Sequence, residues 1–350
     1  MDGKRKLTQL SELGEFKLID HLTKDFVNQN KSSLKGIGDD AAVISTSNGD
    51  IVLTTDLLVE GIHFNLVYTP LKHIGYKSVV VNLSDIYAMN ARPSQITVSL
   101  AVSKKFSLEA LEEFYAGVKL ACERYCVDLV GGDTSSSITG MMVSITAVGF
   151  APAERLVYRN GACINDLICV SGDLGAAYTG LQILERERKI FESDPLIQPD
   201  LAGYDYILAR QLKPEARIDI IEKLEKSSIL PTSMIDISDG LSSDLLHICT
   251  QSKVGCRIYQ EKIPINKETA RVAGELNLEP LICALNGGED YELLFTIPLG
   301  EAEKATGLQD VSVIGHITGQ EKGIKIVTDG GSEILLDAEG WDTMASKNHS

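Results

Sequence analysis

Hydrophobic positions along the chain recur with two spacings, which divide it into predicted helices and strands. Apolar residues spaced three and four apart predict helices over residues 13–28, 75–90, 107–126, 174–188, 214–226, 241–252 and 267–276. Alternating or short continuous apolar runs predict strands over residues 95–103, 127–134, 141–150, 166–171, 234–239, 256–259, 291–297, 311–317 and 324–328, besides two within 35–64. The short 127–134 strand is predicted to be buried. This order of elements indicates an α+β fold rather than a doubly wound parallel sheet.

Length and local composition predict two domains. The 350 residues exceed the size at which a single hydrophobic core usually stops growing. Residues 151–163, APAERLVYRNGAC, place a proline and two turn signals between two well-patterned blocks. The expected domains are therefore residues 1–151 and 152–350.

Charge and composition exclude several classes of protein. A formal net charge of −16 opposes a nucleic-acid surface, because phosphate backbones are bound chiefly by clustered Lys and Arg. No apolar run approaches the roughly 20 residues of a membrane span, and the first 16 residues lack the apolar segment of a secretory signal. The seven Cys form no Cys-x-x-Cys pair, which favours reduced thiols over disulfides or zinc. We therefore expect a cytoplasmic protein whose partners include neither nucleic acid nor membrane.

Carboxylates and hydroxyls gather at the ends of two apolar runs between residues 35 and 64. Asp39 and Asp40 open the first run, and the second leads into Thr54, Thr55 and Asp56. Hard oxygen ligands of this kind suit Mg²⁺. The same residue types are also ordinary turn residues between strands, so this stretch alone leaves both interpretations open.

The same pattern recurs in both halves of the chain. Asp133, Asp236 and Asp239 lie at the ends of predicted strands. Asp85 lies three residues after Asn82 on a predicted helix, and Glu289 and Asp290 occupy a Gly-Gly-Glu-Asp turn. Their recurrence predicts an acidic cleft between the domains that holds Mg²⁺. Because carboxylate-bound Mg²⁺ typically bridges substrate phosphates, phosphoryl transfer is the reaction class that this pattern favours. The phosphate-binding loop of common nucleotide folds is absent, and GIGDDA lacks the third glycine of a dinucleotide fingerprint.

Isolated polar residues near these motifs have a plainer interpretation. His63 would more often be structural than functional when it stands alone in a sequence. Lys77 and Arg159 are the cations close to the motifs, and surface exposure is the default for each. Gly131 and Gly132 can form a turn, but glycines before an Asp also allow a backbone to approach phosphate closely.

Seven ordered motifs resemble the thiamine-monophosphate kinase family, within the superfamily that includes aminoimidazole ribonucleotide synthase. From Gly14 to Pro298 these are GEFKLI, GIGDDAAVI, TTDLLVEGIHF, GYKSVVVNLSDIYAMNARP, LVGGDT, IDISDGLSSDL and GGEDYELLFTIP. The resemblance implies phosphorylation of thiamine monophosphate to thiamine diphosphate, with ATP as co-substrate and several Mg²⁺ ions. It also implies a homodimer, an α+β N-terminal domain for ATP, Mg²⁺ and dimerisation, and an α/β C-terminal domain that completes the cleft.

The resemblance assigns roles to individual residues. The implied metal ligands are Asp40, Thr54, Thr55, Asp56, Asp85, Asp133, Asp236 and Asp239. The implied ATP contacts are Gly132, Asp133, Arg159 and Ser238, and the implied substrate contacts are His63, Glu289 and Trp341. The substrate phosphate would attack ATP directly with no phosphoenzyme, and it needs no general base because it is already ionised near neutral pH. Asp39 would point away from Asp40 in a regular strand and is expected to be structural.

Two segments depart from the family pattern, and two other functions stay open. Residues 209–219, ARQLKPEARID, keep only Pro214 and Arg217 of a proline-rich turn, and EGWDTM around Trp341 keeps part of an aromatic tail. The alternatives are another ATP-using enzyme of the superfamily, resembling aminoimidazole ribonucleotide synthase, and a non-catalytic nucleotide-binding maturation factor.

Overall fold

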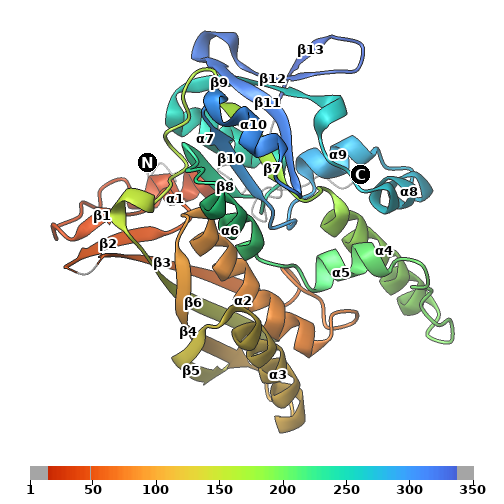
Figure 1. Cartoon of the computed structure of the whole chain (residues 1–350). Helices are drawn as coiled ribbons and strands as arrows, with labels where there is room; N and C mark the ends of the chain where they lie inside the picture. The colour runs from red at the N-terminus through yellow and green to blue at the C-terminus, as the bar shows by residue number, and fades with distance from the viewer. Residues whose placement is uncertain (1–14, 48, 337–350) are drawn as a thin grey trace, which may run out of the picture.

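The computed structural model describes residues 15–47 and 49–336, which form two β-sheets with helices packed against both (Figure 1). The first sheet has the strand order β1-β2-β3-β6-β4-β5. Its strands are β1 (Ser33–Lys35), β2 (Ala42–Thr46), β3 (Gly49–Val59), β6 (Met141–Ala151), β4 (Arg92–Val102) and β5 (Asp128–Ser136). Neighbouring strands are antiparallel except β4 and β5, which are parallel.

The second sheet is also mostly antiparallel, with the order β13-β12-β9-β11-β7-β10-β8. Its strands are β7 (Leu167–Ser171), β8 (Ser233–Asp236), β9 (Val254–Tyr259), β10 (Leu293–Ile297), β11 (Val311–Gly319), β12 (Ile324–Val327) and β13 (Glu333–Leu335). The helices around it are α4 (Ala176–Ser193), α5 (Asp205–Leu212), α6 (Ile218–Lys226), α7 (Leu241–Ser252), α8 (Lys267–Glu275), α9 (Pro280–Asn286) and α10 (Ala302–Thr306). The mixed sheets agree with the predicted α+β class.

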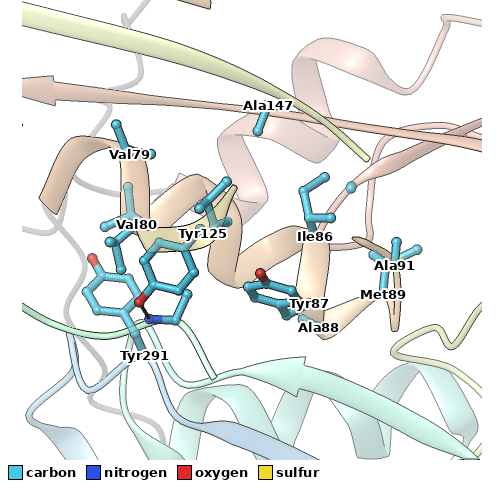
Figure 2. Close-up of a cluster of buried hydrophobic side chains, with 14 of the residues drawn as sticks. Val79, Val80, Ile86, Tyr87, Ala88, Met89, Ala91, Tyr125, Ala147 and Tyr291 are labelled. Carbon is cyan, nitrogen blue, oxygen red and sulfur yellow. Dashed lines mark hydrogen bonds between the residues drawn. The ribbon is translucent and has the colours of Figure 1, made fainter. Parts of the chain in front are cut away.

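Helix α2 (Leu71–Ala88) lies between the two sheets and is buried on nearly all sides. It packs backbone to backbone against α3 (Leu108–Tyr125), because a Cβ on Gly75 would lie 2.0 Å from the carbonyl oxygen of Phe114. Figure 2 shows Tyr87 of α2 in one cluster with Tyr125 of α3 and Tyr291 from the loop before β10. The main hydrophobic core therefore continues from the first sheet into the second.

Three predictions about elements need correction. The strand predicted at 127–134 is present as β5, but its predicted burial is wrong, since every residue of β5 is exposed at the edge of its sheet. The helix predicted from residue 214 begins at Ile218, because Glu215 accepts hydrogen bonds from the Tyr76 and Tyr125 hydroxyls at 2.9 and 2.7 Å. Among the described residues, the first helix is only α1 (Glu15–Thr23). Sequence periodicity also missed α5 and α9.

No helix in the described part of the chain has both the length and the apolar character that crossing a membrane requires.

Candidate active site

Three carboxylates from distant parts of the chain converge where α2 meets the edge of the second sheet. Asp40 comes from the loop before β2, Asp85 from α2 and Asp236 from the end of β8. One oxygen of each lies within 4.8 Å of the others. Such a cluster needs a compensating positive charge, because like charges at this separation oppose joint ionisation.

Hydroxyl and guanidinium groups hold these carboxylates in place. The Thr54 hydroxyl donates to Asp85 at 2.7 Å, and the Ser84 hydroxyl donates to Asp236 at 2.6 Å. The Arg159 guanidinium donates to Oδ1 of Asp40 at 2.6 Å, while Oδ2 of Asp40 is buried without a hydrogen-bond partner. An orphaned carboxylate oxygen among hard oxygen donors fits a divalent cation such as Mg²⁺.

Burial shifts the ionisation of the cluster toward neutral pH. It raises the pKa of Asp40 to about 7, although Arg159 opposes the shift. It raises the pKa of Asp56 and of Asp236 to about 6 each. Burial, and then the charge of Asp56, also raise the pKa of Asp85. Perturbed carboxylates of this kind in a cleft are typical of functional sites.

Asp56 belongs to the same cleft. Its backbone N–H donates to Oδ1 of Asn82 at 3.0 Å, so α2 fixes the end of β3 beside the cluster. A cavity of about 180 Å³ opens there, lined among others by Glu15, Asp56, Asp85, Asp236, Ser238, Asp239 and Glu289. Most of the predicted metal and ATP residues are thus brought together in one place.

A larger cavity of about 740 Å³ adjoins the acidic one and shares Leu58, His63 and Glu289 with it. The Nδ1 atom of His63 accepts the Val59 N–H at 3.0 Å, which assigns the proton of a neutral imidazole to Nε2. Burial lowers the pKa of His63 and favours this neutral form. His63 can therefore donate one hydrogen bond, from Nε2.

The Gly-Gly-Glu-Asp turn carries Glu289 to the wall shared by both cavities. Glu289 has φ = 58°, and its N–H donates to the Ser238 carbonyl at 2.7 Å, which ties the turn to the acidic cleft. Asp290 does not line either cavity. Its carboxylate accepts the N–H groups of Gly175 and Ala177 at 2.7 and 3.3 Å and so caps α4. The expectation that Asp290 joins the acidic cleft is corrected accordingly.

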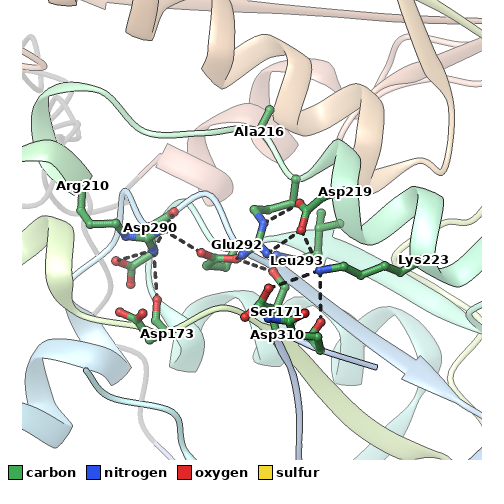
Figure 3. Close-up of polar contacts among 12 residues, drawn as sticks. Ser171, Asp173, Arg210, Ala216, Asp219, Lys223, Asp290, Glu292, Leu293 and Asp310 are labelled. Carbon is green, nitrogen blue, oxygen red and sulfur yellow. Dashed lines mark hydrogen bonds and ion pairs between the residues drawn. The ribbon is translucent and has the colours of Figure 1, made fainter. Parts of the chain in front are cut away.

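A buried ion-pair network lies next to this turn (Figure 3). Glu292 is 0% exposed and pairs with Arg210 at 2.8 Å and with Arg217, while the Ser171 hydroxyl also donates to it. Arg210 further donates to the backbone carbonyl of Asp173 at 3.0 Å. The network fixes β10 and the preceding turn relative to the segment after α5.

Several predicted residues lie elsewhere in the single chain. Thr55 points to the sheet face opposite Thr54, where its hydroxyl donates to the Ile145 carbonyl at 3.0 Å. Gly132 and Asp133 lie on β5, which is separated from β3 by β6 and β4. Three strand spacings put Asp133 about 14 Å from β3. Trp341 lies outside the described residues.

The structure also places four residues outside the predicted site set. Asp39 pairs with Lys35 at 2.9 Å and accepts the Arg159 N–H at 3.1 Å, as expected for a structural residue. Lys77 is 5% exposed, so the default of surface exposure is wrong for it. Glu15 and Gln211 line the cavities although neither was predicted as a site residue; Glu15 lies within the GEFKLI motif. The one sequence signal for Lys77 was a lysine inside an otherwise apolar helical run.

Comparison with known families matches both parts of the chain. Residues 38–151 match the N-terminal domain of AIR synthase related proteins, and residues 165–328 match the C-terminal domain. The chain is 36% identical to the thiamine-monophosphate kinase of Aquifex aeolicus, over 95% of this chain and 99% of that protein. It is 35% identical to the enzyme of the same name from Escherichia coli K12, with the same two coverages.

Solved structures show the same similarity. The structure described as AaThiL complexed with AMPPCP and TMP has a TM-score of 0.82 and 34% identity, over 97% of this chain and 99% of that chain. Hydrogenase maturation protein HypE in complex with ATP has a TM-score of 0.67 at 19% identity, over 95% and 98%, which is a likeness of fold alone. These matches confirm the predicted two-domain α+β fold.

The buried network predicts a large effect on stability. We expect Glu292→Gln to lower the free energy of unfolding by about 3 kcal/mol, because it removes the buried carboxylate charge that Arg210 and Arg217 share. The matched control is Glu225→Gln, since Glu225 also pairs with two arginines, Arg92 and Arg155, but is 47% exposed. It should cost less than about 1 kcal/mol. Urea unfolding measures both, and equal costs would contradict the role of Glu292.

Proposed function

Because the chain belongs to the thiamine-monophosphate kinase family, we propose that it transfers the γ-phosphoryl group of ATP to thiamine monophosphate, giving thiamine diphosphate and ADP. The observation that carries the proposal is the buried carboxylate cluster of Asp40, Asp85 and Asp236 beside a cavity of about 740 Å³. The cluster suits the phosphates of both substrates, and the cavity offers space for the thiamine moiety.

We propose that Mg²⁺ ions bind the acidic cleft through Asp40, Asp85 and Asp236, with Thr54, Asp56 and Asp239 as further ligands. The orphaned oxygen of Asp40 and the raised pKa values of the cluster support this set. When bound, the ions neutralise phosphate charge and align the attacking and leaving oxygens. Several ions are proposed because six side chains with oxygen atoms, from β3, α2, β8 and the segments before β2 and after β8, gather here.

Other residues of the chain are proposed to contact ATP and to orient the thiamine moiety. Arg159 and Ser238 border the acidic end and are proposed to contact ATP. His63, donating from Nε2, and Glu289 are proposed to orient the thiamine moiety, because both line the wall between the cavities. The substrate phosphate is already ionised, so orientation and charge neutralisation replace a general base. Trp341 is kept as a proposed substrate contact outside the described residues.

We also propose a homodimer that forms through the open face of the first sheet. Support comes from β5, an edge strand on which Leu129 and Val130 are 45% and 61% exposed, because such an edge invites pairing with another chain. Gly132 and Asp133 lie on this edge strand, whereas Thr55 lies on β3 and faces the side of the sheet opposite Thr54. In the dimer, Asp133 and Gly132 would serve the active site of the other copy.

We make two further proposals, on the domain boundary and on the cellular location. We keep the boundary between domains 1–151 and 152–350, in line with the end of β6 at Ala151. We propose a cytoplasmic location, because all seven Cys are free thiols, as a reducing compartment would leave them.

A product assay tests the activity. Purified protein with ATP, Mg²⁺ and thiamine monophosphate should form thiamine diphosphate and ADP, which chromatography separates. Asp56→Asn should lower kcat by roughly 100-fold or more, since a lost metal ligand removes about 3 kcal/mol of transition-state stabilisation.

The matched control for that assay is Asp329→Asn, which removes an exposed carboxylate in a turn distant from the cleft and should leave kcat unchanged. No product from metal-replete wild-type protein would overturn the proposed function. Nucleotide binding by calorimetry without turnover would instead favour a maturation factor.

Mg²⁺ binding should weaken as the pH falls. The pKa of Asp40 is raised to about 7, so its protonation stabilises the metal-free fold at low pH, and this contribution is lost as the pH rises through about 7. Protons and Mg²⁺ thus compete for the cluster. We expect Mg²⁺ to raise the melting temperature more at about pH 8 than at about pH 6. Scanning fluorimetry measures the difference, which Asp236→Asn should diminish; an equal effect at both pH values would count against these ligands.

Mixed dimers test whether Asp133 acts in the other copy. Asp56→Asn and Asp133→Asn proteins should each be nearly inactive, but after subunit exchange one site of each mixed dimer contains both residues. Random exchange should restore roughly a quarter of wild-type activity. No recovery would place Asp133 in its own chain, and a fully active Asp133→Asn protein would remove it from the site.

A further inference from the structure

Lys77 occupies an unusual place for a lysine. It lies in the middle of α2, between Tyr76 and Ser78, and among the described residues it is the only lysine or arginine in the buried class. Taking an ammonium group out of water costs free energy unless it is paired and hydrogen-bonded. The partners of Lys77 therefore indicate its role.

The partners of Lys77 converge on one carboxylate. Its Nζ lies 2.8 Å from Oε1 of Glu289 and donates to the Gln211 carbonyl at 3.3 Å. Nε2 of Gln211 donates to Oε2 of Glu289 at 2.8 Å. Each oxygen of Glu289 thus has a donor, one from α2 and one from α5.

This arrangement fixes Glu289 where the two cavities meet. The side chain is 21% exposed and lines both of them. The Ser238 carbonyl holds the backbone of Glu289, and the two donors, Lys77 and Gln211, fix the orientation of its side chain. His63, Lys77 and Glu289 all line the larger cavity, so the three groups surround one region of it.

We propose that Lys77 is a positioning residue for the thiamine end of the substrate, which acts by holding the Glu289 carboxylate in place. This inference rests on the proposed function. A carboxylate with two fixed donors keeps lone pairs for a ligand N–H or a cationic ring. Since Lys77 comes from α2 and Glu289 from the turn before β10, the substrate end of the cavity is assembled only when these elements are docked.

Steady-state kinetics of Lys77→Met test the inference. KM for thiamine monophosphate should rise at least tenfold, whereas KM for ATP and kcat should change less than about twofold. Lys77→Arg, which keeps the charge, should recover part of the affinity. The matched control is Lys72→Met, since Lys72 is exposed on the same helix and should leave all three parameters unchanged.

A double-variant cycle separates positioning from direct contact and from stability. If Lys77 acts through Glu289, Lys77→Met adds no further rise in KM for thiamine monophosphate in a Glu289→Gln background. An additional tenfold rise there would show that Lys77 contacts the substrate itself and would overturn the inference. So would a Lys77→Met protein that loses only thermal stability, or one whose KM values for both substrates rise equally.

The wild-type reaction in the same assay keeps the two proposals distinct. If the wild-type protein forms no thiamine diphosphate, the proposed function fails. If the wild-type protein is active and Lys77→Met behaves like it, the inference about Lys77 fails while the function stands.

Discussion

The mutual repulsion of buried carboxylates is the constraint on which the rest of this structure depends. Asp40, Asp85 and Asp236 meet within 4.8 Å, and burial raises the pKa of each. Neither sheet supplies the cluster alone, because one carboxylate precedes β2, one lies on α2 and one ends β8. Packing of the hydrophobic core around α2 must therefore stabilise the close approach of groups that repel each other, until cations and phosphates balance the charge.

Arg159 offsets part of this repulsion, and other cations of the chain pair with carboxylates outside the cluster. Arg159 pairs with Asp40, Lys77 pairs with Glu289, and Arg210 and Arg217 pair with Glu292. Glu292 follows the turn that carries Glu289, and Figure 3 shows Glu292 in the same network as Arg210 and Asp290. The segment between α5 and α6 is also bound to the first half of the chain, where Glu215 accepts hydrogen bonds from Tyr76 and Tyr125. Residues 209–219 thus connect the two sheets beside the larger cavity, which is a structural role for the segment that departs from the family pattern.

Strand ends made part of the acidic cleft predictable, since Asp40 precedes β2 and Asp236 ends β8. Asp56 also adjoins an apolar run, but β3 continues past it to Val59. The role of Lys77 could not be predicted, because its partners, Gln211 in α5 and Glu289 in the turn before β10, are remote from α2 in the sequence. The exposure of β5 could not be predicted either, because an apolar run does not show whether a strand lies inside its sheet or at the edge. The start of α6 at Ile218 depended on Tyr76 and Tyr125, two partners remote in sequence from Pro214.

The proposed function depends most on whether divalent cations bind in the acidic cleft. Anomalous diffraction from crystals grown with Mn²⁺ and a non-hydrolysable ATP analogue would locate them directly. We expect anomalous peaks bounded by the carboxylates of Asp40, Asp85 and Asp236, with the nucleotide phosphates on the open side of the cluster. Ordered nucleotide with no metal peak at these three carboxylates would contradict this expectation.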